Sequence, residues 1–210
     1  MTAGITSLCS AHNTVMDDDL TETVYRALVA RELDDADLSA RKLCRLLGKT
    51  TGALYHRFGS LDGLLFAVSQ RGYADLTTRM QAVFRERSDL ADVAEAFVEF
   101  GLDHPELYPL MFERRFDWAA LRARGVFDAP VESEKLLQAL ACVLEQAGSA
   151  DVEMDGRLLF AGLHGLVSLA ASGRANVGAL DRTDRDVARA AARALARRIL
   201  PSGETGDDRR

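Results

Sequence analysis

Hydrophobic residues recur every three or four positions along most of the chain, which is the spacing of one face of an α-helix. Leu43, Leu46 and Leu47 show this spacing on a short scale, and residues 151–172 show it over a long one. No segment has the sustained alternation and hairpin turns of β-strands, and the chain has only 4 prolines. The pattern therefore predicts an all-α protein.

Capping residues and glycines divide this pattern into about nine helices. The expected helices cover residues 17–32, 39–48, 51–57, 60–86, 90–103, 130–147, 151–172 and 183–199, with a short one after Pro105. The two ends, residues 1–16 and 201–210, are polar and have no periodicity, so we expect disordered tails there. Residues 34–37 are expected to form a loop.

The segment 38–65 contains the signals for two short helices joined by a tight turn. Ser39 can cap a first helix that Gly48 ends, and Thr50 can cap a second helix over Thr51–Arg57. Two short helices joined by a glycine turn are typical of a DNA-binding helix-turn-helix. The same layout also fits a plain helical hairpin with a solvated basic face.

The second of these helices has two different faces. Leu54 and Phe58 share one of them, because each residue turns a helix by about 100°. Thr51, Gly52, Tyr55 and His56 point broadly the other way. That face is small and can donate hydrogen bonds, so it can approach a surface closely.

The charge of the segment agrees with phosphate binding. From Ser39 to Arg71 there are six basic residues and one acidic residue, Asp62, although the whole chain carries a net charge of −6. A local basic patch is enough to attract a polyanion.

The run GKTTGALYHRFGSLDGLL resembles the N-terminal domain of TetR-family transcriptional regulators. The matching positions are Gly48, Thr50, Gly52, Leu54, Tyr55 and Phe58. Two positions depart from the family pattern. Lys49 stands where the family usually buries a residue such as Val, and Leu61 stands where it usually has a phosphate-contacting Lys.

The resemblance implies a DNA-binding domain over residues 17–64 and a helical ligand-binding and dimerisation domain over residues 65–200. It also implies a homodimer formed through the last two helices and a near-palindromic double-stranded DNA operator. A repressor is the most common role in such a family. The residues expected to contact DNA are Ser39, Arg41, Lys42, Arg45, Lys49, Thr50, Thr51, Gly52, Ala53, Tyr55, His56 and Arg57.

Two further stretches resemble the C-terminal domain of one TetR subgroup. Residues 104–112 resemble its His-Pro-x-x-Tyr-x-x-Met-Phe stretch, and residues 160–165 resemble its Trp-His-Gly stretch with Phe160 in the place of Trp. The resemblance implies an unidentified small-molecule effector, apolar or amphipathic. Residues that either line its pocket or simply form core are Phe97, Phe100, Met111, Phe112, Phe116, Trp118, Phe160 and His164.

The sequence gives little support for catalysis, a cofactor or a metal site. There is no nucleophile elbow, no phosphate-binding glycine loop and no paired Cys or His spacing, so we expect no enzyme, cofactor or metal. A metal site at His104 with Asp103 or Glu106 is the alternative to a local hydrogen bond there. The 3 cysteines are odd in number and dispersed, which favours reduced thiols over disulfides.

The last helix carries an arginine at every third or fourth position from 182 to 197. These arginines indicate either a second nucleic-acid stripe or, as we favour, a solvated face balanced by nearby acids. The absence of a signal peptide or apolar span predicts a cytoplasmic protein. The rival interpretation of the whole chain is a helical small-molecule-binding or interaction module with a weakened DNA-binding head.

Overall fold

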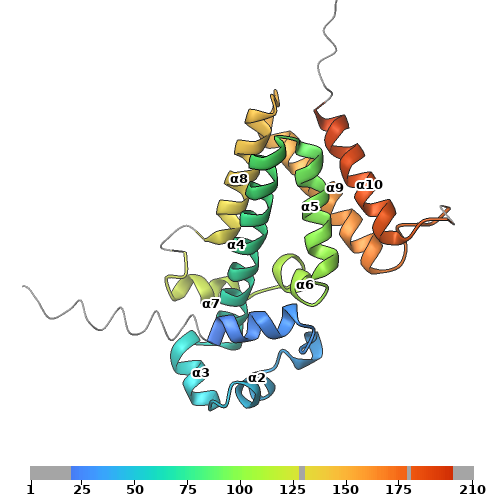
Figure 1. Ribbon diagram of the computed structural model, residues 1–210. Coiled ribbons are helices and arrows are strands. Elements are labelled where there is room, and N and C mark those ends of the chain that lie inside the picture. The colour runs from blue at the N-terminus through green and yellow to red at the C-terminus, as the bar shows by residue number, and fades with distance from the viewer. Residues whose placement is uncertain (1–19, 128–130, 179–180, 201–210) are drawn as a thin grey trace, which may run out of the picture. The chain divides into compact units, whose positions relative to one another are not determined.

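The computed structural model of the chain describes residues 20–127, 131–178 and 181–200. All regular elements in these ranges are helices, as predicted (Figure 1). The predicted tails, 1–16 and 201–210, lie outside the described residues, and so does the acidic start of the first helix at residues 17–19. Within the described ranges, no helix is both long enough and apolar enough to cross a membrane.

The chain divides into two compact units. The first holds residues up to Tyr73 together with Glu106–Glu132, and the second holds Ala74–Pro105 and the residues from Ser133 onward. One long helix, α4 (Leu61–Arg87), contributes to both units. The predicted division into residues 17–64 and 65–200 stays a prediction.

The first unit contains the predicted helix-turn-helix. Residues 20–29 are helical. They are followed by the short 3-10 helix η1 (Asp35–Asp37), α2 (Ala40–Leu46), α3 (Thr51–Phe58), the first part of α4, α6 (Leu107–Phe112) and α7 (Trp118–Ala123). Val24, Leu28, Leu43 and Leu64 are fully buried and form its centre.

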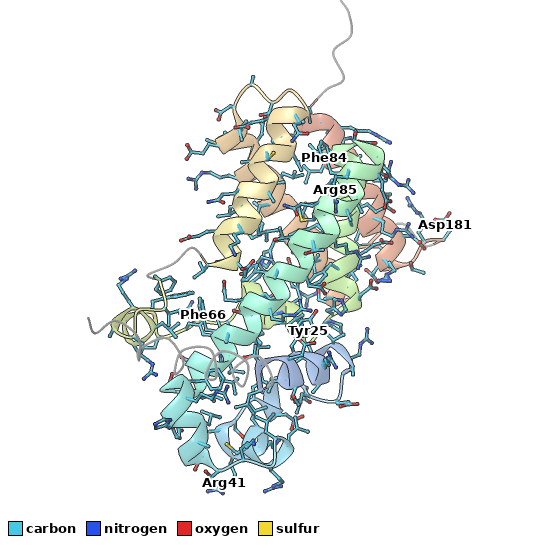
Figure 2. All side chains as sticks on the ribbon, turned by 60° about the vertical axis from the view of Figure 1, so that its left-hand side comes forward. Tyr25, Arg41, Phe66, Phe84, Arg85 and Asp181 are labelled. Carbon is cyan, nitrogen blue, oxygen red and sulfur yellow. The ribbon has the colours of Figure 1, made fainter. Side chains whose placement is uncertain are left out.

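The first helix, residues 20–29, is bound to α4 through one arginine. Arg71 of α4 donates from Nε to the Glu22 carboxylate at 3.1 Å. Its guanidinium also lies over the Tyr25 ring, 4.6 Å from the ring centre. Figure 2 labels Tyr25 on this helix. A charged contact and a cation–π contact therefore hold the same arginine.

Residues 111–117 are bound to α4 within the same unit. The Tyr73 hydroxyl donates to the Met111 carbonyl at 2.5 Å, and burial raises the pKa of Tyr73 to about 12, so this hydroxyl keeps its proton at neutral pH. Arg114 donates to the Asp62 carboxylate at 2.9 Å. The other oxygen of Asp62 accepts from the backbone N–H of Asp117 at 3.2 Å.

The second unit is a helical bundle. It consists of the second part of α4, α5 (Leu90–Asp103), α8 (Glu132–Gln146), α9 (Val152–Ala171) and α10 (Asp184–Ile199). Helices α5, α9 and α10 all contact one another. Large apolar side chains from α5, such as Phe97 and Phe100, are almost fully buried in it.

The inner face of α10 differs from the predicted one. The sequence favours a stripe of Val187, Ala191, Leu195 and Ile199, yet these residues are only half-buried. The buried stripe is Ala188, Ala192 and Ala196, one position further along. Alanines lie innermost because they let α10 approach α5 and α9 closely, while the larger side chains flank the contact.

Arginines of α10 form ion pairs with acids of α5. Arg193 bonds to both Asp92 and Glu95, the second at 2.7 Å. One turn earlier, Arg189 binds Glu95 at 2.6 Å and Glu99 at 3.2 Å. One turn earlier again, Arg185 pairs with Asp103. We call these pairs the α5–α10 ladder. Arg185, Arg189 and Arg193 are therefore already paired within this unit, which favours a structural role over a nucleic-acid stripe.

Two predicted core leucines are exposed. Leu46 of α2 is 46% exposed, because that short helix buries Leu43 and Cys44 instead. Leu137 of α8 is 60% exposed, because Leu136 and its neighbours one turn away fill the interior.

Candidate nucleic-acid interface and apolar cavity

Helix α3 is fixed at both ends by the residues that the sequence indicates. The Thr50 hydroxyl accepts a hydrogen bond from the backbone N–H of Ala53 at 3.3 Å, which caps the first turn. At the other end Gly59 adopts a left-handed conformation with φ of 73°, which a side chain would disfavour. Gly48 does the same after α2, with φ of 60°.

Only one side chain of α3 is fully anchored in the unit. Leu54 is 3% exposed and packs inward, whereas Phe58 is half-buried. The opposite face is open, and Tyr55 is 48% exposed. The other exposed residues of this helix are Thr51, Gly52, Ala53 and His56. The predicted reading face is therefore free to approach a groove.

Helix α2 contacts α3 and, together with the turn after it, carries exposed basic side chains. Its first turn is capped by the Ser39 hydroxyl, which accepts from the Lys42 backbone N–H at 3.4 Å. Arg41, Arg45 and Lys49 are exposed. Figure 2 shows Arg41 at the outer edge of α2. These side chains can reach phosphates without breaking an interaction in the unit.

Two predicted phosphate contacts are less free. Lys42 donates from Nζ to the Asp37 carboxylate at 2.8 Å and to the Ala36 carbonyl at 3.1 Å. Arg57 is half-buried, with its guanidinium 5.7 Å from the centre of the Phe58 ring. Burial also lowers the pKa of Arg57 from its ordinary value. These two residues would have to exchange existing contacts for a phosphate.

The start of α4 offers no cation to this surface. Leu61 is half-buried and apolar. Ser60 caps the helix instead, since its hydroxyl accepts from the Gly63 backbone N–H at 3.0 Å. The carbonyl of Phe58 lies where a Cβ at residue 63 would stand, so α3 and α4 meet backbone to backbone.

In the second unit, an enclosed apolar cavity lies beside two of the predicted ligand residues. Its volume is about 20 Å³, and its lining includes Phe97, Leu140 and Phe160. The rings of Phe97 and Phe160 meet edge to face, with centres 6.2 Å apart. The ring of His164 stacks on Phe160 at 6.0 Å.

A larger groove, which Phe160 also lines, lies next to this cavity. It measures about 530 Å³ and runs between α8 and α9, with Leu137, Leu144 and Gly156 among its lining residues. Arg157 and Glu153 stand at its rim and pair with each other at 2.8 Å. Phe160, Leu137 and Leu140 therefore line both the small cavity and the open apolar groove.

The eight residues predicted to line a pocket fall into two sets. Phe97, Phe100, Phe160 and His164 belong to the second unit, and Met111, Phe112, Phe116 and Trp118 belong to the first. In the first unit, Phe66 contacts Phe116 and Trp118 edge to face, with ring centres 5.6 and 6.0 Å away.

The alternative metal site at His104 gains no support. The His104 ring lies edge to face on Phe100 at 4.7 Å. Within the residues that the structure describes, no three His, Cys, Asp or Glu side chains are grouped to hold a metal ion.

The C-terminal part of the chain matches a known family. The family described as "Tetracyclin repressor-like, C-terminal domain" matches residues 90–198, which is more than half of the chain and includes all of α5 and α9 and all but the last residue of α10. The chain belongs to the tetracycline repressor-like (TetR) family. The resemblance seen in the sequence is thereby confirmed at the level of family.

Solved structures extend the TetR-like fold to most of the chain. SCO4313, a protein assigned a regulatory role, aligns over 89% of this chain and 97% of its own with a TM-score of 0.62 and 15% identity. A protein of unknown function from Rhodococcus sp. RHA1 aligns over 84% and 95%, with a TM-score of 0.60 and 25% identity.

The TetR-family transcriptional regulator PfmR from Thermus thermophilus aligns over 90% of this chain and 96% of its own, with a TM-score of 0.53 and 20% identity. Comparison with curated protein sequences gives no significant match. These likenesses support the TetR-like fold, and the function rests on the residues of this chain.

Proposed function

We propose that this TetR-family protein is a ligand-responsive transcriptional regulator, with repression as its expected role, that binds a near-palindromic operator as a homodimer. The observation that carries the proposal is α3. It is capped by Thr50, anchored by Leu54 and exposed along its small polar face. A short helix held in this way suits insertion into the major groove of DNA.

Different residues of α3 would make different kinds of contact with DNA. Thr51, Tyr55 and His56 are exposed and can donate hydrogen bonds to base edges or to nearby backbone. Gly52 allows close approach, and Ala53 can make only apolar contact, for example with a thymine methyl group. Few of these side chains can form two hydrogen bonds to one base, so we expect DNA shape to contribute to specificity.

The dimer would form through α9 and α10, since α9 has an apolar stripe that is left exposed among the residues that the structure describes. Met154, Leu158 and Leu169 are its exposed large residues. Gly165 lies among them and has no atom within 4 Å of where a Cβ would stand. A second copy covering this stripe would place two α3 helices in successive major grooves.

The effector would be a small apolar or amphipathic molecule bound in the second unit. The apolar walls at Phe97 and Phe160 suit such a ligand, but the enclosed volume of about 20 Å³ holds little more than one water molecule. Ligand entry therefore requires side chains shared by the cavity and the groove, such as Phe160, to move. A ligand that prefers one arrangement of the chain then shifts the population of DNA-binding dimers.

Selection of bound DNA from a genomic pool tests the proposal. We expect enrichment of a short inverted repeat at low salt, and its release or tightening when apolar ligands are added. If a folded dimer enriches no sequence and binds no duplex even at low salt, the proposed function as a transcriptional regulator is wrong. The rival, a small-molecule-binding or interaction module with a weakened head, would then be favoured.

A further inference from the structure

An arginine from a distant part of the sequence lies at the end of α3. Arg124 directly follows α7, which belongs to the same compact unit as α3 (Figure 1). Its guanidinium occupies the space where a Cβ at residue 59 would stand. Gly59 therefore suits both the left-handed backbone at the end of α3 and the close approach of this guanidinium.

The charge of Arg124 is available to a partner outside the unit. Its side chain is exposed, and none of the carboxylates in the described ranges lies within ion-pair distance of it. Arg114 in the same segment is different, because it is bound to Asp62 at 2.9 Å. The two arginines are ten residues apart and have distinct surroundings.

The position of Arg124 matters because α3 ends there. The C-terminal end of a helix carries a partial negative charge, which disfavours an approaching phosphate. Leu61, two residues after Gly59, supplies no compensating charge. DNA whose backbone passes this end of α3 would meet Arg124 as the nearby exposed cation.

We propose that Arg124 binds a backbone phosphate of DNA at the C-terminal end of α3. This inference rests on the proposed function and deepens it. The phosphate contact comes from the residue that follows α7, outside the helix-turn-helix, and it supplies the positive charge that Leu61 lacks. Segment 106–132 then becomes part of the DNA-binding surface as well as a support for α4.

The salt dependence of binding tests the inference. The logarithm of the binding constant falls with the logarithm of salt concentration by about 0.9 for each phosphate contact. In a dimer, Arg124→Gln therefore makes this slope shallower by about 1.8, and raises Kd about tenfold at physiological salt. The probes are the selected operator fragment and a duplex of unrelated sequence. Both should lose affinity, since a phosphate contact does not depend on sequence.

Matched variants separate a DNA contact from a structural one. Arg124→Lys should keep most of the slope, and Leu61→Lys added to Arg124→Gln should restore part of it. Arg85→Gln removes the same charge from an exposed position near the other end of α4 (labelled in Figure 2) and should leave the slope unchanged.

The outcomes are distinguishable. If the wild-type protein binds no duplex at low salt, both the proposed function and this inference fail. If wild-type protein binds but Arg124→Gln gives the same slope as Arg85→Gln, the inference alone fails. A lowered melting temperature with an unchanged slope would likewise overturn it, because Arg124 would then only stabilise the end of α3.

Discussion

The contact between α3 and α4 depends on the absence of one side chain. At Gly63 a Cβ would collide with the backbone carbonyl of Phe58, which cannot rotate away as a flexible side chain could. We predict that Gly63→Ala destabilises the protein by about 1–3 kcal/mol, because either α3 or α4 must shift. Urea denaturation followed by circular dichroism measures this loss.

The control is another helical glycine. At Gly52 of α3 a Cβ would meet only the Thr50 side-chain oxygen, at an ordinary contact distance of 3.8 Å. Measured without DNA, Gly52→Ala should leave the free energy of unfolding unchanged or raise it by roughly 0.5–1 kcal/mol through helix propensity. Equal losses for both variants would contradict the steric explanation.

Tyr55 is the largest exposed side chain on the reading face of α3. We predict that Tyr55→Ala weakens operator binding about tenfold while the helical content and dimer mass stay unchanged, since a hydrogen bond and its contact area are lost. A mobility-shift titration measures this. Wild-type affinity in the variant would exclude Tyr55 from recognition.

At the residue scale, the sequence predicts helix-capping residues better than it predicts which side chains contact one another. Ser39, Thr50 and Gly48 have the predicted roles, because capping depends on neighbours a few residues away. The pairing of Lys42 with Asp37 was not anticipated, although both lie close in sequence. The contact between Arg124 and Gly59 has no local signal at all.

At the element scale, helix α7 is the main feature that periodicity misses. It has only six residues, Trp118–Ala123, and buries a single leucine, Leu121. So short a helix shows no repeat of its apolar positions. It is stabilised by the Asp117 carboxylate, which accepts from the Ala120 backbone N–H at 3.0 Å. By contrast, α5, α8, α9 and α10 lie within a few residues of their predicted bounds.

The α5–α10 ladder makes the stability of the fold depend on pH. A hydrogen bond from Arg193 lowers the pKa of Asp92 below its ordinary value of 3.8. Burial acts against the Glu95 carboxylate, but the bonds from Arg193 and Arg189 outweigh it and lower its pKa below 4.5. A lowered pKa means stabilisation that is present above these values and lost as pH falls through the folded-state pKa.

We predict that Arg193→Leu lowers the free energy of unfolding at pH 7 by about 1–3 kcal/mol, because Asp92 loses its arginine donor and Glu95 loses one of its two. Its stability should also fall less than that of the wild type when pH drops below about 4. Urea denaturation across this range measures both effects. Arg157→Leu, which removes an exposed pair with Glu153, serves as control and should cost under about 0.5 kcal/mol. Parallel pH profiles would show that the ladder does not cause the acid sensitivity.

At the scale of the whole molecule, the exposed stripe of α9 sets the expected assembly. We predict that Leu158→Glu converts the dimer to a monomer of 22.9 kDa, because a charge would be buried between copies. Light scattering after size exclusion measures the mass. Leu137→Glu introduces the same charge at an exposed leucine on α8 and should stay dimeric. A monomeric wild type, or a dimer that tolerates Leu158→Glu, would contradict this interface.

The family and the all-α class could be predicted from sequence, because Gly48, Leu54 and Tyr55 stand at characteristic spacings and helical periodicity is local. The grouping of the aromatic residues could not. Phe116 and Trp118 contact Phe66 of α4, which is about fifty residues away along the chain. Such contacts depend on how the chain returns to α4, and no local pattern encodes that.

The α5–α10 ladder also limits which changes of length the protein can tolerate. Arg185, Arg189 and Arg193 face α5 only because they are four residues apart on one continuous helix. One residue inserted in α10 before Arg189 would turn every later side chain by about 100° around the helix axis. The arginines after the insertion and the alanine stripe would leave their partners together. Related proteins should therefore vary freely in sequence along α10 while keeping the number of residues between these arginines.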